Sequence, residues 1–409
     1  MTLFENIGAL VGAGSPGPKR GADMADIDVL YDAWMLVDEV KGTVEAVGLM
    51  SGPCPAEDAD VRDVEGAWVF PSFCDSHTHI VYAGSREKEF ADKIKGLTYE
   101  EIARRGGGIL NSVDRLRAVS EDDLFAGAMK RVEEIIAKGT GAVEIKSGYG
   151  LDLENELKML RVVRRIKESV PMEVVSTFLG AHAVPREYRG RREDYVDYIC
   201  REMIPAVGRE GLADFVDLFC ERGFFTPEDV DKVFESASAY GIKRTLHANQ
   251  LAVSGGVQAG VRHEAFSVDH LENVGETEIQ LLGASQTVAT ILPGASFFLD
   301  MVYGPARRFI DAGACVALAS DYNPGSSPSG DMRFVVSLGC IKLKMTIAEA
   351  LNAATVNGAQ AMDLHNVGTL SPGMTANFFM TGRLPSLEYL AYAYTTPVIK
   401  ETYLRGRRV

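Results

Sequence analysis

Eight short apolar runs alternate with amphipathic helical segments through the middle of the 409-residue chain, and this alternation constrains the fold most strongly. The runs lie near residues 68–79, 142–150, 173–182, 214–223, 244–250, 266–273, 286–294 and 315–325. Strands that alternate with helices form right-handed βαβ units and a parallel sheet. Because eight such units close a (β/α)₈ barrel, we predict a TIM-like barrel over residues 67–370.

The two ends of the chain have a different pattern. Residues 1–66 and 371–409 contain short runs of apolar and β-branched residues, broken by Gly and Asp and without helix-capping signals. We therefore predict that both ends pair into one small β-sandwich domain beside the barrel. The predicted fold class is α/β.

The charge balance limits the class of partner. The chain has 42 Lys and Arg against 57 Asp and Glu, a net charge of −15, which argues against nucleic acid or an anionic membrane as the main partner. Six dispersed Cys form no CxxC pair, so a disulfide framework is not indicated. No apolar run is long enough for a membrane span and the first residues lack a signal-peptide pattern, so we expect a cytoplasmic protein.

Five of the seven histidines fall at the ends of the predicted strands, where a barrel of this kind carries its active site. His77 and His79 share one face of a strand, because alternate strand residues point the same way. His247 and Asp321 end the fifth and eighth runs. Three imidazoles and a carboxylate suit a first-row metal such as Zn²⁺ or Fe²⁺ and leave a position for water. We therefore predict a metal site at these four residues.

The remaining strand-end histidines and nearby residues suggest catalysis and substrate binding. His270 ends the sixth run and is, with Asp321, a candidate for acid–base chemistry. It could also be a fourth nitrogen ligand or a satisfied core histidine, but we favour a residue that holds the attacking water or polarises a carbonyl. His182 ends the third run and could donate a hydrogen bond to substrate, whereas Tyr99 and Tyr149 could line a pocket or simply pack.

Three charged or reactive residues lie near these positions. Arg86 follows the HxH pair, and its guanidinium could grip a substrate carboxylate through two hydrogen bonds or be an exposed charge at a helix start. Lys146 could bridge two metals if carboxylated, but an ion pair with Glu144 inside the barrel is favoured. Cys220 is interpreted as a small buried hydrophobe rather than a nucleophile.

These features together resemble a known group of enzymes. The barrel with its HxH pair, two further strand-end histidines and Asp321 resembles the amidohydrolase superfamily, in which a β domain from both termini flanks the barrel. Longer segments resemble the imidazolonepropionases of histidine breakdown. The stretches that carry this resemblance are PSFCDSHTHIVYAGSREKEF, LTYEEIARRGGGIL, EIKSGYGLD, FLGAHAVP, VDHLE and SDYNPGSSP, which span the barrel.

The resemblance implies hydrolysis of 4-imidazolone-5-propanoate to N-formimino-L-glutamate, with one Zn²⁺ or Fe ion (2+ or 3+) as cofactor. We expect Asp321 to accept a proton from the attacking water, with help from His270, before the ring C–N bond breaks. A homodimer is the expectation from the family. The residues that the resemblance places around the substrate are Arg86, Tyr99, Tyr149, His182, Asn323, Gly325 and Ser326.

One residue departs from the family pattern. Some members carry a Glu three residues after the fifth-strand histidine, where this chain carries Gln250. An amide can hydrogen-bond the ring but cannot exchange a proton, so we assign Gln250 to substrate binding alone. Two other functions stay open. An aminohydrolase for a nucleobase or another heterocycle would be expected to carry that Glu, and a metal-free, non-catalytic barrel would have lost its metal ligands.

Overall fold

A (β/α)₈ barrel forms the larger part of the protein. The computed structural model describes residues 1–54, 58–96, 101 and 107–409. Eight parallel strands follow one another around the barrel in chain order, and each overlaps one predicted run, which confirms the predicted fold class. These strands are β6 (Phe73–Asp75), β7 (Thr140–Lys146), β8 (Glu173–Ala181), β9 (Phe215–Cys220), β10 (Lys243–Ala248), β11 (Ser267–His270), β12 (Val288–Ile291) and β13 (Val316–Leu318).

Backbone hydrogen bonds close the barrel between its first strand, β6, and its last strand, β13. They join the segments that directly follow these two strands. The Asp321 N–H donates to the His77 carbonyl at 3.0 Å, and the His79 N–H donates to the Tyr322 carbonyl at 2.9 Å. Thr78 and Tyr322 form an isolated parallel bridge at the same place. Two predicted metal ligands that follow β6 and one that follows β13 are therefore brought together by the closure itself.

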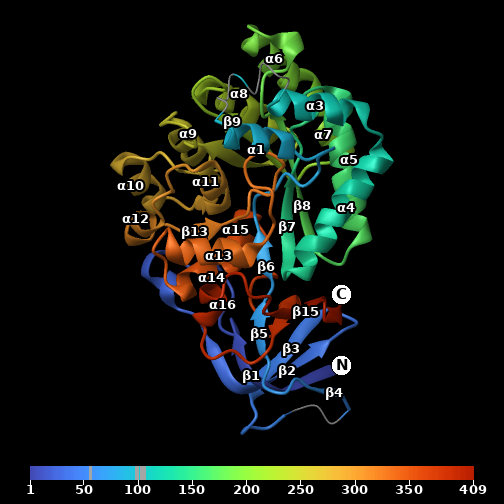
Figure 1. Cartoon of the computed structure of the whole chain (residues 1–409), viewed down its shortest axis with the longest axis vertical. Helices are drawn as coiled ribbons and strands as arrows, with labels where there is room; N and C mark the ends of the chain where they lie inside the picture. The colour runs from blue at the N-terminus through green and yellow to red at the C-terminus, as the bar shows by residue number, and fades with distance from the viewer. Residues whose placement is uncertain (55–57, 97–100, 102–106) are drawn as a thin grey trace.

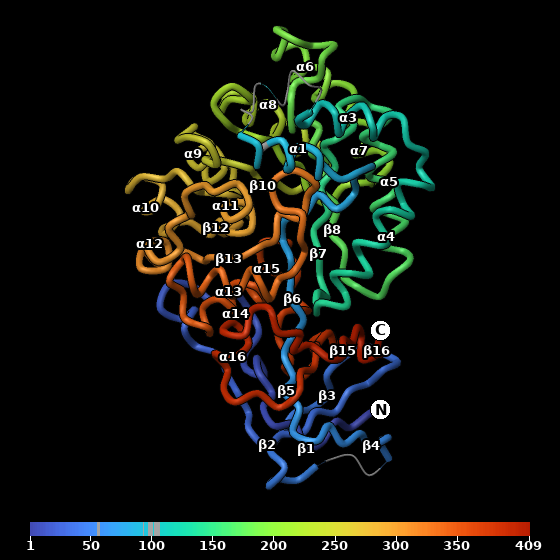
Figure 2. The backbone as a smooth tube through the Cα atoms, viewed as in Figure 1, coloured from blue at the N-terminus to red at the C-terminus, as the bar shows by residue number. Residues whose placement is uncertain are grey.

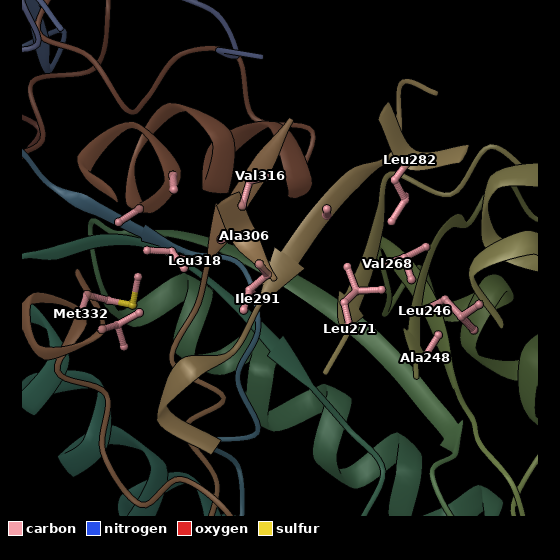
Figure 3. Close-up of a cluster of buried hydrophobic side chains, with 14 of the residues drawn as sticks. Leu246, Ala248, Val268, Leu271, Leu282, Ile291, Ala306, Val316, Leu318 and Met332 are labelled. Atoms are coloured by element: carbon pink, nitrogen blue, oxygen red, sulfur yellow. The ribbon is translucent and has the colours of Figure 1, made fainter. Parts of the chain in front are cut away.

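Helices pack on the outside of this barrel (Figure 1). Residues of β10 and β11, such as Leu246 and Val268, lie in one buried cluster with Leu282 of α10 (Figure 3). The helices are α1 (Glu87–Ile94), α3 (Ile109–Ala118), α4 (Glu121–Ala137), α5 (Leu153–Ser169), α6 (Arg192–Tyr198), α7 (Ile204–Glu210), α8 (Pro227–Ser238), α9 (Gly256–Arg262), α10 (Glu276–Ala284), α11 (Pro293–Leu299), α12 (Ala306–Asp311), α13 (Met332–Ile341), α14 (Ile347–Ala354), α15 (Val356–Ala361) and α16 (Tyr389–Tyr392).

Both ends of the chain build a separate mixed sheet, in the order β16-β15-β14-β5-β1-β2-β3, with β4 paired to β1. Its strands are β1 (Thr2–Val11), β2 (Val29–Asp38), β3 (Thr43–Leu49), β4 (Asp60–Asp63), β5 (Trp68–Pro71), β14 (Phe378–Thr381), β15 (Ile399–Leu404) and β16 (Arg407–Arg408). The predicted pairing of the two ends is confirmed. The domain boundaries after residues 66 and 370 stay a prediction, and β5, just past the first of them, pairs with β1 and β14 of this sheet.

The path of the chain places the mouth of the barrel away from the terminal sheet. β5 leaves that sheet and runs on into β6, so the carboxyl end of β6 points away from it (Figure 2). Because the barrel strands are parallel, all their carboxyl ends lie at this far end, beside α1, α3 and α6 (Figure 1). Across the described ranges of the chain, no helix is long and apolar enough to cross a membrane.

Candidate active site

Five buried side chains predicted from the strand ends meet at the barrel mouth. Potential ligand atoms of His77, His79 and His247 all lie within 4.8 Å of one another, and those of His77, His270 and Asp321 form a second such group. The Nε2 atoms of His77 and His79 lie 3.7 and 3.6 Å from Asp321 Oδ1. The structure therefore brings together all four predicted metal ligands, with His270 beside them.

Two buried aspartates fix the proton on two of these imidazoles. His77 Nδ1 lies 2.6 Å from Asp269 Oδ2, and His247 Nδ1 lies 2.7 Å from Asp217 Oδ2. An ionised carboxylate accepts a hydrogen bond, so each Nδ1 holds the proton and each Nε2 keeps its lone pair. Neither aspartate was predicted from the sequence. The available signal was an Asp inside the fourth apolar run and another directly before His270.

A fully buried ammonium supports these aspartates. Lys146 Nζ lies 2.8 Å from Glu144 Oε1, which confirms the predicted ion pair, and 3.0 Å from Asp217 Oδ2. Burial lowers the pKa of Lys146, but the neighbouring carboxylates outweigh burial and raise that pKa above its ordinary value. Burial likewise raises the pKa of Asp217, but His247 and Lys146 outweigh it and lower the pKa. Both groups therefore stay charged.

The electrostatics of the cluster suit a bound cation. Burial lowers the pKa of His77 and His79 well below the ordinary value, and it lowers the pKa of His247 to about 4. These rings are therefore neutral, which is the form that ligates a metal. Among the described residues, the buried His77 Nε2 has no hydrogen-bond partner. A lone pair left unpaired beside an aspartate oxygen fits a metal ligand, so the residues present fit one divalent ion.

The backbone is strained where several of these residues leave their strands. Asn249, His270 and Asp321 have φ values of 59°, 84° and 53°, in the left-handed region that non-glycine residues rarely adopt. Each such conformation costs about 1–3 kcal/mol and persists only where the surroundings hold it, as at functional sites. At Asn249 the side-chain amide donates to the Asn273 carbonyl at 2.9 Å. The strained turns mark the same strand ends as the cluster.

A cavity of about 370 Å³ opens above the cluster. Its size suits a small heterocycle with a short side chain, and its other walls are apolar, among them Phe219, Phe224 and Leu299. His77 lies buried below it, and Tyr99 lies outside the described residues. The predicted site residues that line the cavity are His79, Arg86, Tyr149, His182, His247, Gln250, His270, Asp321, Asn323, Gly325 and Ser326.

Arg86 provides a fixed cation in the cavity wall. Its Nε and Nη2 donate to Glu89 Oε2 at 2.9 and 2.5 Å, and Glu89 Oε1 accepts from the Gly108 N–H at 3.1 Å. A Cβ atom at Gly325 would collide with Arg86 Nη1, so the glycine makes room for the guanidinium. Glu89 was missed by sequence analysis, although its spacing of three residues from Arg86 along a helix was a usable signal.

His182 presents an acceptor to the cavity rather than the expected donor. Its Nδ1 lies 3.0 Å from the Gly148 carbonyl oxygen, which can only accept. Burial lowers the pKa of His182 to about 3, so the ring is neutral and its single proton is on Nδ1. The Nε2 lone pair is therefore free for a substrate N–H. Its role in substrate binding stays a prediction.

Asn323 uses its amide within the loop after β13. Its Nδ2 donates to the Asp321 carbonyl at 2.6 Å and to Ser326 Oγ at 2.7 Å. Its Oδ1 accepts from the N–H groups of Gly325 and Ser326, both at 2.8 Å. The amide is thus saturated, and it shapes the cavity wall by holding this loop. Substrate contacts of Asn323, Gly325 and Ser326 stay predictions.

Comparison with known sequences gives consistent matches over nearly the whole chain. The model of the amidohydrolase family matches residues 68–409. The chain is 47% identical to an imidazolonepropionase from Christiangramia forsetii, over 95% of this chain and 94% of that protein. It is 44% identical to an imidazolonepropionase from Flavobacterium johnsoniae, over 100% of this chain and 99% of that protein.

Comparison with solved structures gives the same architecture at low sequence identity. Atrazine chlorohydrolase from Arthrobacter aurescens, complexed with zinc, aligns with a TM-score of 0.72 and 13% identity over 100% of this chain and 95% of that one. Guanine deaminase from C. acetobutylicum, with bound guanine, aligns with a TM-score of 0.68 and 14% identity over 100% of this chain and 99% of that one. These likenesses show the fold. The match to the amidohydrolase family and the buried histidine–aspartate group of this chain together imply a divalent metal site.

Replacing Asp217 with asparagine tests the orientation of His247. An amide N–H in place of the carboxylate favours the tautomer with its proton on Nε2, which blocks the lone pair, so we expect the affinity for Zn²⁺ to fall about 10–100-fold. The measurement is competition with a chelator of known affinity. Asp214→Asn is the matched control and should bind Zn²⁺ as the native protein does, because Asp214 directly precedes β9 and pairs with Lys167. Equal affinity in both variants would show that Asp217 does not set the tautomer.

Proposed function

Because the chain belongs to the amidohydrolase family, and within it to the imidazolonepropionases, we propose that its barrel mouth hydrolyses 4-imidazolone-5-propanoate to N-formimino-L-glutamate. One observation carries the proposal: a single cavity joins the Arg86 cation to the buried histidine–aspartate cluster. The substrate matches both features, since it is a small anion that carries a cyclic amide. Water adds to the ring carbonyl, the adjacent C–N bond breaks, the ring nitrogen takes a proton, and a new carboxylate remains.

We propose that His77, His79, His247 and Asp321 hold one divalent ion, zinc or iron, since imidazole and carboxylate ligands suit both. When bound, such an ion supplies hydroxide near neutral pH and polarises a carbonyl oxygen. The site is preorganised for an ion. His77 and His247 hold their protons on Nδ1, and burial keeps His77 neutral, so the Nε2 lone pairs of these rings are available.

Asp321 is the proposed proton acceptor. Its Oδ1 lies nearest the Nε2 atoms of His77 and His79, whereas its Oδ2 accepts from Ser326 Oγ at 3.2 Å. The two oxygens thus have different surroundings, which supports one as a ligand and the other as the base that takes the proton of the attacking water and returns it to the ring nitrogen.

The remaining polar residues are proposed to hold the ring and its carbonyl. His270, held through Nδ1 by Glu272 Oε1 at 3.3 Å, is placed to hold the attacking water or polarise the carbonyl. His182 Nε2 can accept from a ring N–H. The Gln250 side chain lines the same cavity and can donate or accept, but it cannot transfer a proton.

The alternatives have less support. An aminohydrolase that protonates a leaving amine needs an acid where this cavity has the Gln250 amide. A metal-free barrel gives no reason for four candidate ligands to converge, or for His77 and His247 to hold their protons on Nδ1. Homodimerisation, the cytoplasmic location and the exclusion of nucleic acid and membrane partners stay predictions.

The proposed reaction is tested by following the ultraviolet absorbance of freshly prepared 4-imidazolone-5-propanoate with purified protein. We expect the ring chromophore to disappear, the loss to stop with a chelator, and activity to return when zinc or iron is added. If metal-replete protein leaves the chromophore unchanged but releases ammonia from a nucleobase, the heterocycle aminohydrolase is the correct function.

Asp321→Asn tests the proton acceptor. An amide keeps the shape and one oxygen but cannot accept the proton, so we expect turnover to fall about 100-fold or more in protein whose metal content has been measured. Asp311→Asn, an exposed aspartate on α12, is the control and should leave turnover unchanged. Substantial turnover by metal-loaded Asp321→Asn would remove this residue as the base.

Arg86→Lys tests recognition of the propionate. Lysine keeps the charge but loses the planar pair of donors, so we expect KM to rise about 10-fold or more with a much smaller change in kcat. Arg115→Lys is the matched control, since Arg115 donates to the nearby Ser85 carbonyl at 3.0 Å and does not line the cavity. A fall in kcat at unchanged KM would contradict the assigned role.

A further inference from the structure

A second, larger cavity of about 660 Å³ lies beside the catalytic one. It is formed by the segments that follow β8, β9 and β10 at the mouth of the barrel, including the start of α8. Its walls carry three arginines, Arg189, Arg192 and Arg222. None of these arginines belongs to the proposed metal site or substrate cavity.

The two cavities share a thin wall. The Phe224 side chain lines both of them. After β10, Gln250 and Leu251 line the catalytic cavity, whereas Val253 and Ser254, only a few residues later, line the second one. The two cavities therefore border the same short segments.

A buried carboxylate holds this wall in place. Glu221 Oε1 accepts from the Gln250 N–H at 2.6 Å, and Glu221 Oε2 accepts from the Ala252 N–H at 3.3 Å. Glu221 also lines the second cavity, but among the described residues it forms no ion pair with the arginines there. Glu221 thus fixes the segment after β10.

The charge of the second cavity is unusual for this protein. In the portion of the chain that the structure describes, neither Arg189 nor Arg222 has a carboxylate within ion-pair distance, whereas Arg192 Nε lies 3.1 Å from Asp229 Oδ2. The chain as a whole has a net charge of −15. Two unpaired guanidinium groups around one hollow create a local positive potential, which attracts and can grip anions.

We propose that this cavity is a second binding site, for a small dicarboxylate. The inference rests on the proposed function, because hydrolysis converts a substrate with one carboxylate into a product with two. Among the described side chains, the catalytic cavity offers one arginine, Arg86, which matches the single carboxylate of the substrate. The neighbouring cavity offers two arginines without an ion-pair partner, which match the two carboxylates of the product. The site gives the dicarboxylate a place to bind once it has passed Phe224 on the way out.

The test is calorimetric titration of the metal-loaded enzyme with the dicarboxylate glutarate. We expect saturable binding that becomes about 10-fold weaker or more in the Arg189→Gln/Arg222→Gln variant, since each lost guanidinium removes charge-assisted hydrogen bonds. Arg191→Gln/Arg201→Gln is the matched control. It removes the same charge from exposed arginines of the same region that pair with Asp194 and Asp197 and lie outside the cavity, so its affinity should equal the native value.

A titration of Arg86→Met locates the bound glutarate. Binding that persists in Arg86→Met and is lost in Arg189→Gln/Arg222→Gln supports the second site. Binding that is lost only in Arg86→Met places glutarate in the catalytic cavity and overturns the inference, as does an absence of binding to the native enzyme. The heat of binding needs no turnover, so a dicarboxylate site that persists without hydrolysis of imidazolone propionate would overturn the proposed function alone.

Discussion

One buried ammonium connects the residues on which the site depends. Lys146 Nζ lies within 2.8 to 3.8 Å of oxygens of Glu144, Asp217 and Asp269. Asp217 and Asp269 hold the Nδ1 protons of His247 and His77. Glu144 accepts from the N–H of Thr78, the residue between the two histidines of the HxH pair, at 3.3 Å. Three strands are thereby linked to the cluster through a single charge.

This arrangement is stable only as a complete set. Taking a charge out of water is expensive unless partners replace the lost hydration, and removal of one member leaves the others uncompensated. The barrel supplies such a place, since parallel strands aim their side chains at a common dry interior. The same burial keeps the imidazoles neutral and ready to bind a cation. Burial therefore keeps His77 and His79 neutral, whereas their ionic partners keep Lys146 and Asp217 charged against the effect of burial.

The proposed recognition of anions at the barrel mouth depends on a separate set of residues, the arginines. Arginines line both cavities at the barrel mouth, and their surroundings differ. Arg86 pairs with Glu89 and packs against Gly325. Its guanidinium is therefore held in place, and its charge is partly balanced by Glu89 before a substrate carboxylate binds. Arg189 and Arg222 are exposed and have no ion-pair partner among the residues that the structure describes. Arginines that differ in pairing and exposure suit the binding and release of a small anion better than one tightly binding site.

Sequence patterns were enough to predict the barrel and the positions of the central site residues. The eight apolar runs predict parallel strands, and residues at the ends of such strands converge whatever the loops between them do, so His77, His79, His247, His270 and Asp321 could be identified. The structure alone decided what each group touches. The contacts of Asp217 and Asp269, the Glu89 partner of Arg86, the tautomer of His182 and the second cavity depend on side chains from elements far apart in the chain. No local pattern encodes those distances, because they are fixed only when the barrel closes and its segments pack.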